Sequence, residues 1–285
     1  MLVLSAGTGR VVQAIARELG RLPGPKRFLP AGTARAAVTG FEAIAPGVAD
    51  RASRARALEG ARELVVLPTF DARAVDAQCA LVREAAAAGI RRIRLGSLIG
   101  ADPRSPVCLL RWVGLLEREV TATGVAHDVL RCAPFMQNLA LFIRRDAAGL
   151  TVAGPFRDAA FPWVDAADVG LILAGMLERS DSGNVLCQLS GPEQVGFEAV
   201  ARELGEALRE RVRYVDVCLP EAQGLLEAHG FTPPQIRALT EYWDYLVSGV
   251  IRPVCCDTSL RLLGRAPRTL AQYLAAHAPE LRLAA

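Results

Sequence analysis

Along the first half of the chain, short apolar runs alternate with stretches whose apolar residues recur at helical spacing. Residues 1–4 form an apolar run that predicts a buried strand, and residues 5–9 form a small, glycine-containing turn. Residues 10–20 carry Val11, Val12, Ile15 and Leu19 on one face, which predicts a helix that ends at Gly20. A strand, a glycine turn and a helix in this order direct backbone N–H groups and a positive helix end at a phosphate.

The alternation continues to about residue 130. Further strands are predicted at 27–29, 36–39, 63–67, 93–95 and 125–130, and further helices at 52–58, 71–88 and 106–124. Strands and helices that alternate at this spacing form parallel sheets covered by helices on both faces. The sequence therefore predicts an α/β fold with a Rossmann-type, doubly wound parallel sheet.

After loops at 154–155 and 161–162, predicted helices outnumber predicted strands in the second half of the chain. Helices are predicted at 168–177, 197–209, 220–229, 234–247 and 269–276, with strands at 185–189 and 212–217. We interpret residues 1–155 as a Rossmann-type domain with a degenerate dinucleotide signature. Residues 156–285 then form a smaller, mostly helical substrate-binding cap that is interleaved with the first domain, and a cleft is expected between the two.

Composition narrows the functional classes. A net charge of +3 over 285 residues argues against nucleic acid or an anionic membrane as partner, and no apolar run reaches the length of a membrane span. The seven cysteines are scattered, without a CxxC spacing, which predicts reduced thiols in a cytoplasmic protein. There is no GxSxG, no HExxH and no cluster of metal ligands, so we expect neither a serine hydrolase nor a metal site.

The turn after the first strand only partly matches the dinucleotide-binding pattern. The three small positions of that pattern fall on Ala6, Gly9 and Val12, of which only Gly9 is glycine. The pattern therefore leaves open whether NADP, NAD or no dinucleotide binds. If one does, the cofactor-binding residues are Gly7, Thr8, Gly9, Arg10 and Val11.

Several stretches match one family in order and spacing. The matching stretches are residues 86–93, 97–102, 130–138 (the family's LRPxxFMxN stretch), 163–169 (WVDxxDV), 189–193 with 212–215 (TGPE and the following strand), and 264–269 (GRxPRT). Together they resemble the NmrA-like branch of the atypical short-chain dehydrogenase/reductases. The resemblance implies a Rossmann domain, a small helical C-terminal domain and a substrate cleft. Members of this family are NAD(P)-dependent reductases, nucleotide-sensing regulators or repurposed enzymes.

This chain departs from the family at positions that matter for chemistry. The wider superfamily uses a tyrosine and, four residues later, a lysine, yet the first tyrosine here is Tyr214 and Lys26 is the only lysine. The arginine that NADP-binding members carry after the second strand falls near Ala31, although Arg35 could reach back. Phe41 stands where the family has an acidic residue.

Candidate catalytic residues follow from these comparisons and from chemistry. Ser97 occupies the family's serine position; His127 could act in acid–base catalysis or be a hydrogen-bonded core residue. Tyr242 and Asp244 lie on a predicted helix, where a carboxylate beside an apolar wall can serve as acid or base and is otherwise a solvated residue. The resemblance would bring a substrate-binding set to the cleft, with core packing as the alternative for each aromatic: Phe135, Met136, Asn138, Trp163, Tyr242 and Trp243.

Three functional hypotheses follow. The first is an enzyme of specialised metabolism that binds an aromatic or polyketide-like substrate and catalyses a non-redox step, such as cyclisation, isomerisation or dehydration, because the tyrosine–lysine pair is absent. The second is an NAD(P)H-dependent reductase of a quinone, enone or imine. The third is a non-catalytic nucleotide-sensing regulator. In each case we expect a small-molecule ligand and no nucleic-acid or membrane partner, and a homodimer stays open.

Overall fold

The chain forms two compact units in a computed structural model that describes residues 1–32, 38–147, 149–179 and 183–283. The first unit comprises Met1–Cys132 and Ala166–Leu189, and the second comprises Ala133–Asp165 and Ser190–Ala285. The sequence-based boundary after residue 155 falls inside the first segment of the second unit. The chain therefore passes between the units more than once.

The first unit is built on a seven-stranded sheet in which every neighbouring pair of strands is parallel. In sheet order the strands are β10 (Val185–Leu189), β6 (Ala126–Cys132), β5 (Arg92–Leu98), β4 (Glu63–Val66), β1 (Leu2–Ala6), β2 (Lys26–Pro30) and β3 (Glu42–Ala43). The chain winds outward from β1 to β2 and β3, then crosses back to β4 on the other side. This confirms the predicted Rossmann-type fold and makes β1 and β4 the switch point, where such sheets bind ligands.

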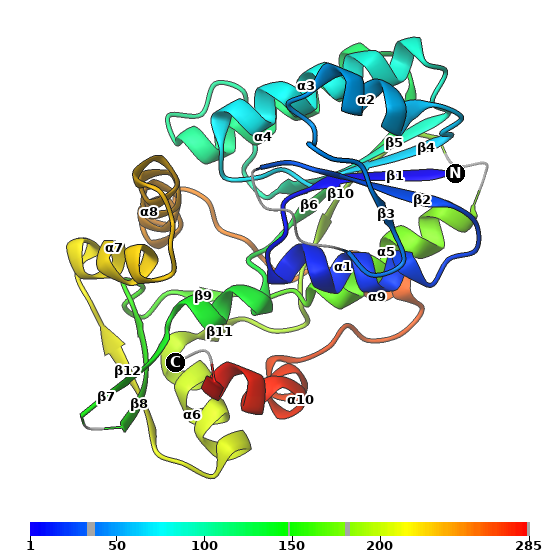
Figure 1. Cartoon of the computed structure of the whole chain (residues 1–285). Helices are drawn as coiled ribbons and strands as arrows, with labels where there is room; N and C mark the ends of the chain where they lie inside the picture. Colours follow the sequence, from blue (N-terminus) through cyan, green and yellow to red (C-terminus); the bar gives the residue numbers. More distant parts are fainter. Residues whose placement is uncertain (33–37, 148, 180–182, 284–285) are drawn as a thin grey trace. The chain divides into compact units, whose positions relative to one another are not determined.

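Helices cover both faces of this sheet (Figure 1). On one face α1 (Arg10–Gly20) packs against α5 (Ala166–Glu178), and on the other α3 (Ala72–Ala87) packs against both α2 (Arg51–Leu58) and α4 (Cys108–Ala122). The β1, β4 and β5 strands bury Val3, Leu64 and Ile93 beneath α2 and α3 in one apolar core. Asp71 caps α3 as its sequence position predicts, because its carboxylate accepts the N–H of Ala74 at 2.9 Å.

The second unit combines small sheets with helices. One sheet has the order β12 (Val212–Asp216), β8 (Gly149–Gly154) and β7 (Ile143–Asp146), and the other pairs β9 (Ala160–Phe161) with β11 (Val195–Gly196). Its helices are η1 (Met136–Leu141), α6 (Phe197–Leu208), α7 (Leu219–Ala228), α8 (Pro233–Val247), α9 (Thr258–Leu263) and α10 (Leu270–Leu283). The mostly helical C-terminal portion agrees with the sequence-based expectation.

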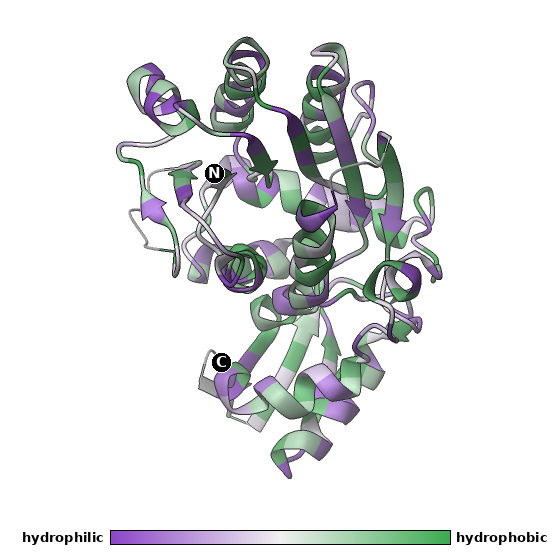
Figure 2. Ribbon diagram, turned by 90° about the vertical axis from the view of Figure 1, so that its right-hand side faces the viewer, coloured by the Kyte–Doolittle hydropathy of each residue, from purple (hydrophilic) through white to green (hydrophobic). Residues whose placement is uncertain are grey.

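The structure corrects the sequence analysis in two places. The hairpin of β7 and β8 was not predicted from the sequence. The strand predicted at 36–39 begins outside the described residues, and the third strand lies instead at Glu42–Ala43. Hydrophilic and hydrophobic residues are interspersed along the helices (Figure 2). Accordingly, none of the helices that the structure describes is both long and apolar enough to cross a membrane.

Candidate functional site

The N-terminus of α1 follows the short turn after β1. Gly9 is the N-cap residue, with φ −69° and ψ 171°, and it makes no side-chain cap hydrogen bond. The first hydrogen bond of the helix runs from the N–H of Gln13 to the carbonyl of Gly9 at 3.0 Å. The N–H groups before Gln13 have no partner within the helix and carry the positive end of its dipole. This is the geometry that binds a phosphate.

Val12, the least favourable residue of the glycine pattern, is accommodated. Its side chain is buried in a regular α1 helix. The close approach of this helix to a neighbour is provided instead by Gly170 on α5, where a Cβ would lie 3.0 Å from both the Ile15 carbonyl and the Glu18 Cβ. Sequence reasoning did not identify this glycine. Val12 is therefore no obstacle to the fold of the turn.

A buried hydroxyl lies beside the turn. Thr69, in the loop after β4, places its Cγ2 3.4 Å from where a Cβ of Gly7 would be. Its Oγ1 is buried and has no hydrogen-bond partner among the described residues. Gln78 of α3 donates to the Leu67 carbonyl at 3.0 Å and so holds the start of this loop. An uncapped helix end fits the pyrophosphate of a dinucleotide, and the Thr69 side chain lies beside the turn that precedes this end.

The end of β2 lies next to this turn. The N–H of Ala31 donates to the Ala6 carbonyl at 2.7 Å, so the position where NADP-binding relatives carry arginine holds a small, buried residue. Arg27 is at the other end of β2 and donates to the carbonyls of Arg56 and Glu59, each at 2.7 Å, at the end of α2. Arg35 lies outside the described residues.

Ser97 takes part in a polar cluster at the carboxyl ends of β5 and β6. Its buried hydroxyl donates to Glu117 of α4. Arg131 donates to both oxygens of the same carboxylate, at 2.9 and 2.6 Å, and to the Ala101 carbonyl at 3.1 Å. The bond to Glu117 raises the pKa of Arg131. Sequence reasoning missed Glu117. This residue of α4 connects its helix to β5 through Ser97 and to β6 through Arg131.

His127 lies elsewhere. It is the second residue of β6, at the amino-terminal end of the strand, and pairs with Ile93. Its Nδ1 lies 2.9 Å from the Val125 carbonyl, and its backbone N–H donates to Asn184. The structure does not bring His127 to the carboxyl edge that carries Ser97 and the turn, so it is not included among the proposed functional residues.

Two of the proposed substrate-binding aromatics belong to the core of the second unit. Trp243 lies 5.1 Å from Phe142, and Trp163 lies 5.5 Å from Phe197, measured between ring centroids. Both tryptophans are buried, and Trp163 Nε1 donates to the Val195 carbonyl at 2.9 Å. Phe156 and Phe161 complete this cluster. Trp163 and Trp243 therefore pack within this core, and a role in substrate binding stays a prediction.

The other candidates of the second unit differ in exposure. Met136 and Tyr242 are buried, Phe135 and Asn138 are half-buried at the start of η1, and Asp244 is exposed on α8. The exposure of Asp244 matches the solvated alternative, because its side chain faces water on α8. Phe135 and Asn138 keep surface available for a ligand.

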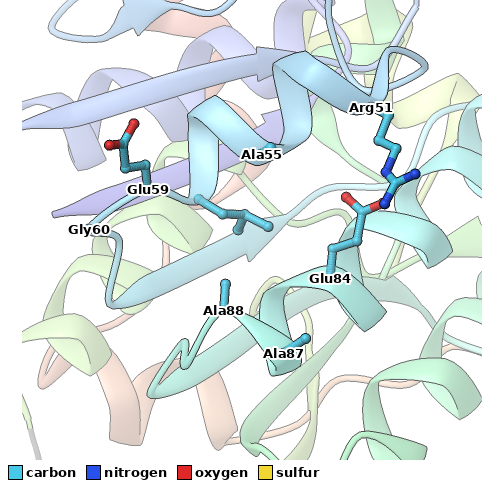
Figure 3. A pocket seen from close by; sticks show the side chains of 8 residues that line it. Arg51, Ala55, Glu59, Gly60, Glu84, Ala87 and Ala88 are labelled. Carbon is cyan, nitrogen blue, oxygen red and sulfur yellow. The ribbon is translucent and has the colours of Figure 1, made fainter.

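A hollow of about 430 Å³ lies between α2 and α3 (Figure 3). Leu58, Ala87 and Ala88 give it apolar walls, and the side chains of Arg51 and Glu84 point toward one another at its rim (Figure 3). Glu84 also receives two hydrogen bonds of 2.8 Å from Arg54, which lower its pKa. The hollow borders the ends of α2 and α3, at the opposite edge of the sheet from the turn, and so is separate from the phosphate-binding geometry. Within the described ranges no three His, Cys, Asp or Glu side chains gather to hold a metal ion.

Comparison with known proteins gives relatives over the whole chain, although no family model matches it. An NAD(P)H azoreductase of Xenophilus azovorans is 27% identical over 286 residues, covering 98% of each chain. An NADPH-dependent quinone oxidoreductase of Escherichia coli, solved with NADPH, superimposes with a TM-score of 0.75 at 19% identity, over 97% of this chain and 99% of that one. NmrA, a negative transcriptional regulator, superimposes with a TM-score of 0.67 at 17% identity, over 98% and 96%. The chain has the fold of the NmrA-like proteins.

These relatives correct the leading functional hypothesis. The prediction of a non-redox cyclisation, isomerisation or dehydration is wrong, since the relative that matches over the whole chain is named an NAD(P)H azoreductase. The prediction gave too much weight to the missing tyrosine–lysine pair. The NmrA-like fold also occurs in a regulator, so the fold by itself does not decide between enzyme and sensor.

Proposed function

We propose that this NmrA-like chain is an NAD(P)H-dependent reductase of a small conjugated acceptor, such as a quinone, an enone, an imine or an azo compound. The observation that carries the proposal is the uncapped N-terminus of α1, with the Thr69 side chain beside the turn that precedes it. The full-length similarity to an NAD(P)H azoreductase supports it. A dinucleotide would be held by the backbone of Gly7, Thr8, Gly9, Arg10 and Val11, and by Thr69.

When bound, the reduced nicotinamide supplies a hydride. Among the residues described at the carboxyl edge, Ser97 and Glu117 are already engaged with one another and with Arg131. The Ser97 hydroxyl donates a hydrogen bond to Glu117. The Glu117 carboxylate accepts this bond and two more from Arg131. Their role is to fix the loop after β5 and the end of β6, so we assign Ser97 to positioning and not to acid catalysis.

The absence of a dedicated acid favours a particular class of acceptor. An isolated ketone that accepts a hydride leaves an alkoxide, which an adjacent acid must protonate. A quinone or an azo compound spreads the same charge over a conjugated system, so water can supply the proton later. The chain is therefore suited to acceptors that stabilise their own reduced anion.

The proposal is tested by following the oxidation of NADPH and NADH by the purified protein. The acceptors are a naphthoquinone and an azo dye, with an unconjugated ketone of similar size as control. We expect turnover with the conjugated acceptors to be at least about tenfold faster than with the ketone. This ratio corresponds to a difference of about 1.4 kcal/mol in activation free energy. No turnover with any acceptor would contradict the proposal, and tight NADPH binding without turnover would favour the sensor.

A further inference from the structure

Cys255 and Cys256 stand side by side in the segment that joins α8 to α9 of the second unit. No other two of the seven cysteines are adjacent in the sequence. Cys255 is exposed and Cys256 is half-buried, and the structure holds both as thiols. Neighbouring thiols at a surface form a pair of soft sulfur ligands.

The backbone that carries this pair is fixed by the second unit. Ser190 Oγ accepts the N–H of Cys256 at 2.9 Å and lies 3.4 Å from its Sγ. Ser259 accepts the N–H of Ser190 at 3.2 Å and donates to its carbonyl at 2.8 Å. Gln194 donates to the Pro253 carbonyl at 2.9 Å on the other side of the pair. The backbone of the segment that carries both thiols is thus held before any ligand arrives, which lowers the entropic cost of binding.

The ligand count indicates what the pair can bind. Zinc requires four protein ligands in a structural site and three in a catalytic one. No third His, Cys, Asp or Glu joins the two thiols in a metal-holding group within the part of the chain that the structure describes. Trivalent arsenic that already carries one organic group needs only two sulfurs to complete its coordination.

The protonation state of the thiols also favours an organoarsenic(III) ligand. Partial burial raises the pKa of the Cys255 thiol, and the neighbouring Cys256 and Glu193 raise it further. A thiol that stays protonated at neutral pH reacts slowly with oxidants and alkylating agents, which need the thiolate. An organoarsenic(III) oxide condenses with neutral thiols, so a raised pKa does not prevent it from binding.

We propose that Cys255 and Cys256 form a dithiol site for monosubstituted trivalent arsenicals. An arsenic oxide R–As=O and the two thiols give a cyclic R–As(S)₂ group and one water. Two As–S bonds form, both S–H bonds break, and the oxide oxygen leaves as water with the two protons. Neither arsenic nor sulfur changes oxidation state, so no further reactant is needed.

The test uses phenylarsine oxide with the full-length protein, and intact-mass spectrometry in the presence of excess monothiol. The wild-type chain should retain one phenylarsenic group, whereas Cys255→Ser and Cys256→Ser should each lose it. The loss of affinity should be about a hundredfold, because the second As–S bond of a chelate is intramolecular.

The matched control is Cys218→Ser. Cys218 is exposed and is the N-cap of α7, a position where serine is favourable, so this variant keeps its fold and should retain the adduct. Thermal denaturation confirms that the Cys255 and Cys256 variants are folded. Retention of the adduct by either single variant, or by the double variant, would overturn the proposal.

Discussion

Gly9 decides, at the scale of single residues, what the turn after β1 can bind. Its φ of −69° is one that any residue adopts, and a Cβ at this position would meet nothing within 4 Å. Gly9 is therefore required neither by backbone strain nor by packing within the protein. A larger N-cap side chain would instead occupy the helix end that the phosphate needs.

The variant Gly9→Asp separates binding from folding. Its carboxylate should cap α1 and favour the helix dipole, leaving stability unchanged or raising it by about 0.5 kcal/mol. The same charge should repel a pyrophosphate and weaken NADPH binding at least about tenfold, or 1.4 kcal/mol. Calorimetry with NADPH and thermal denaturation measure the two effects. The control is Gly9→Ala, which adds neither a charge nor a cap and should keep most of the affinity for NADPH. Equal NADPH affinity in Gly9→Asp and the wild type would show that the phosphate binds elsewhere.

Individual site residues were predicted from sequence with mixed success. The helix at 106–124 was expected, but Glu117 stands beside Arg118 and Glu119, and only the phase of the folded helix shows which charge meets Arg131. The two tryptophans were placed in a cleft because aromatic residues line pockets and cores alike. Their burial in the second unit could be seen only once β8, α6 and α8 were in place.

At the scale of elements, a buried charge cluster joins β4, β5 and β6. Asp128 is fully buried, with its carboxylate 3.0 Å from Arg92 and 3.3 Å from Arg94. Arg94 also pairs with Glu63 and donates to the Met176 carbonyl at 2.7 Å, which connects the sheet to α5. Removing one member leaves an opposite charge in a medium that solvates it poorly.

Asp128→Asn should therefore lower the free energy of unfolding by about 3 kcal/mol. The measurement is equilibrium denaturation in urea. Glu42→Gln serves as the control, since Glu42 lies 3.8 Å from Arg27 but is exposed, and it should change stability by less than about 0.5 kcal/mol. Similar values for the two variants would show that the buried cluster does not hold the strands together.

Glu203 on α6 gives the second unit a dependence on pH. One of its carboxylate oxygens is buried without a hydrogen-bond partner among the described residues. Burial raises the pKa of this carboxyl group, and Glu193 raises it further. Folding therefore favours the protonated form, so its contribution to stability is present at acid pH and is lost as the pH rises through the raised pKa.

We expect Glu203→Gln to be more stable than the wild type at neutral pH, with the difference vanishing below about pH 4, where glutamate is protonated in the unfolded chain too. Thermal denaturation across this pH range measures it. Glu227→Gln, on α7 and exposed, should show no such trend. A stabilisation that persists unchanged at acid pH would rule out the protonation mechanism.

The whole molecule combines a clear fold with a reduced catalytic apparatus. The order of strands and helices in the first unit was predictable because buried parallel strands leave short, continuous apolar runs between helical stretches. The β7–β8 hairpin was not, since its strands are short and stabilise one another only by pairing in the folded chain. The chemistry was misjudged because a missing tyrosine–lysine pair was taken as a missing redox reaction, whereas a conjugated acceptor can be reduced without it.

Calorimetric titration of the cofactor-free protein with NADPH tests the central claim most directly. The account predicts one site per chain with low-micromolar affinity, about −8 kcal/mol, through the N-terminus of α1. No heat of binding at millimolar NADPH, from protein shown to be folded and free of bound nucleotide, would contradict both the site and the proposed reductase.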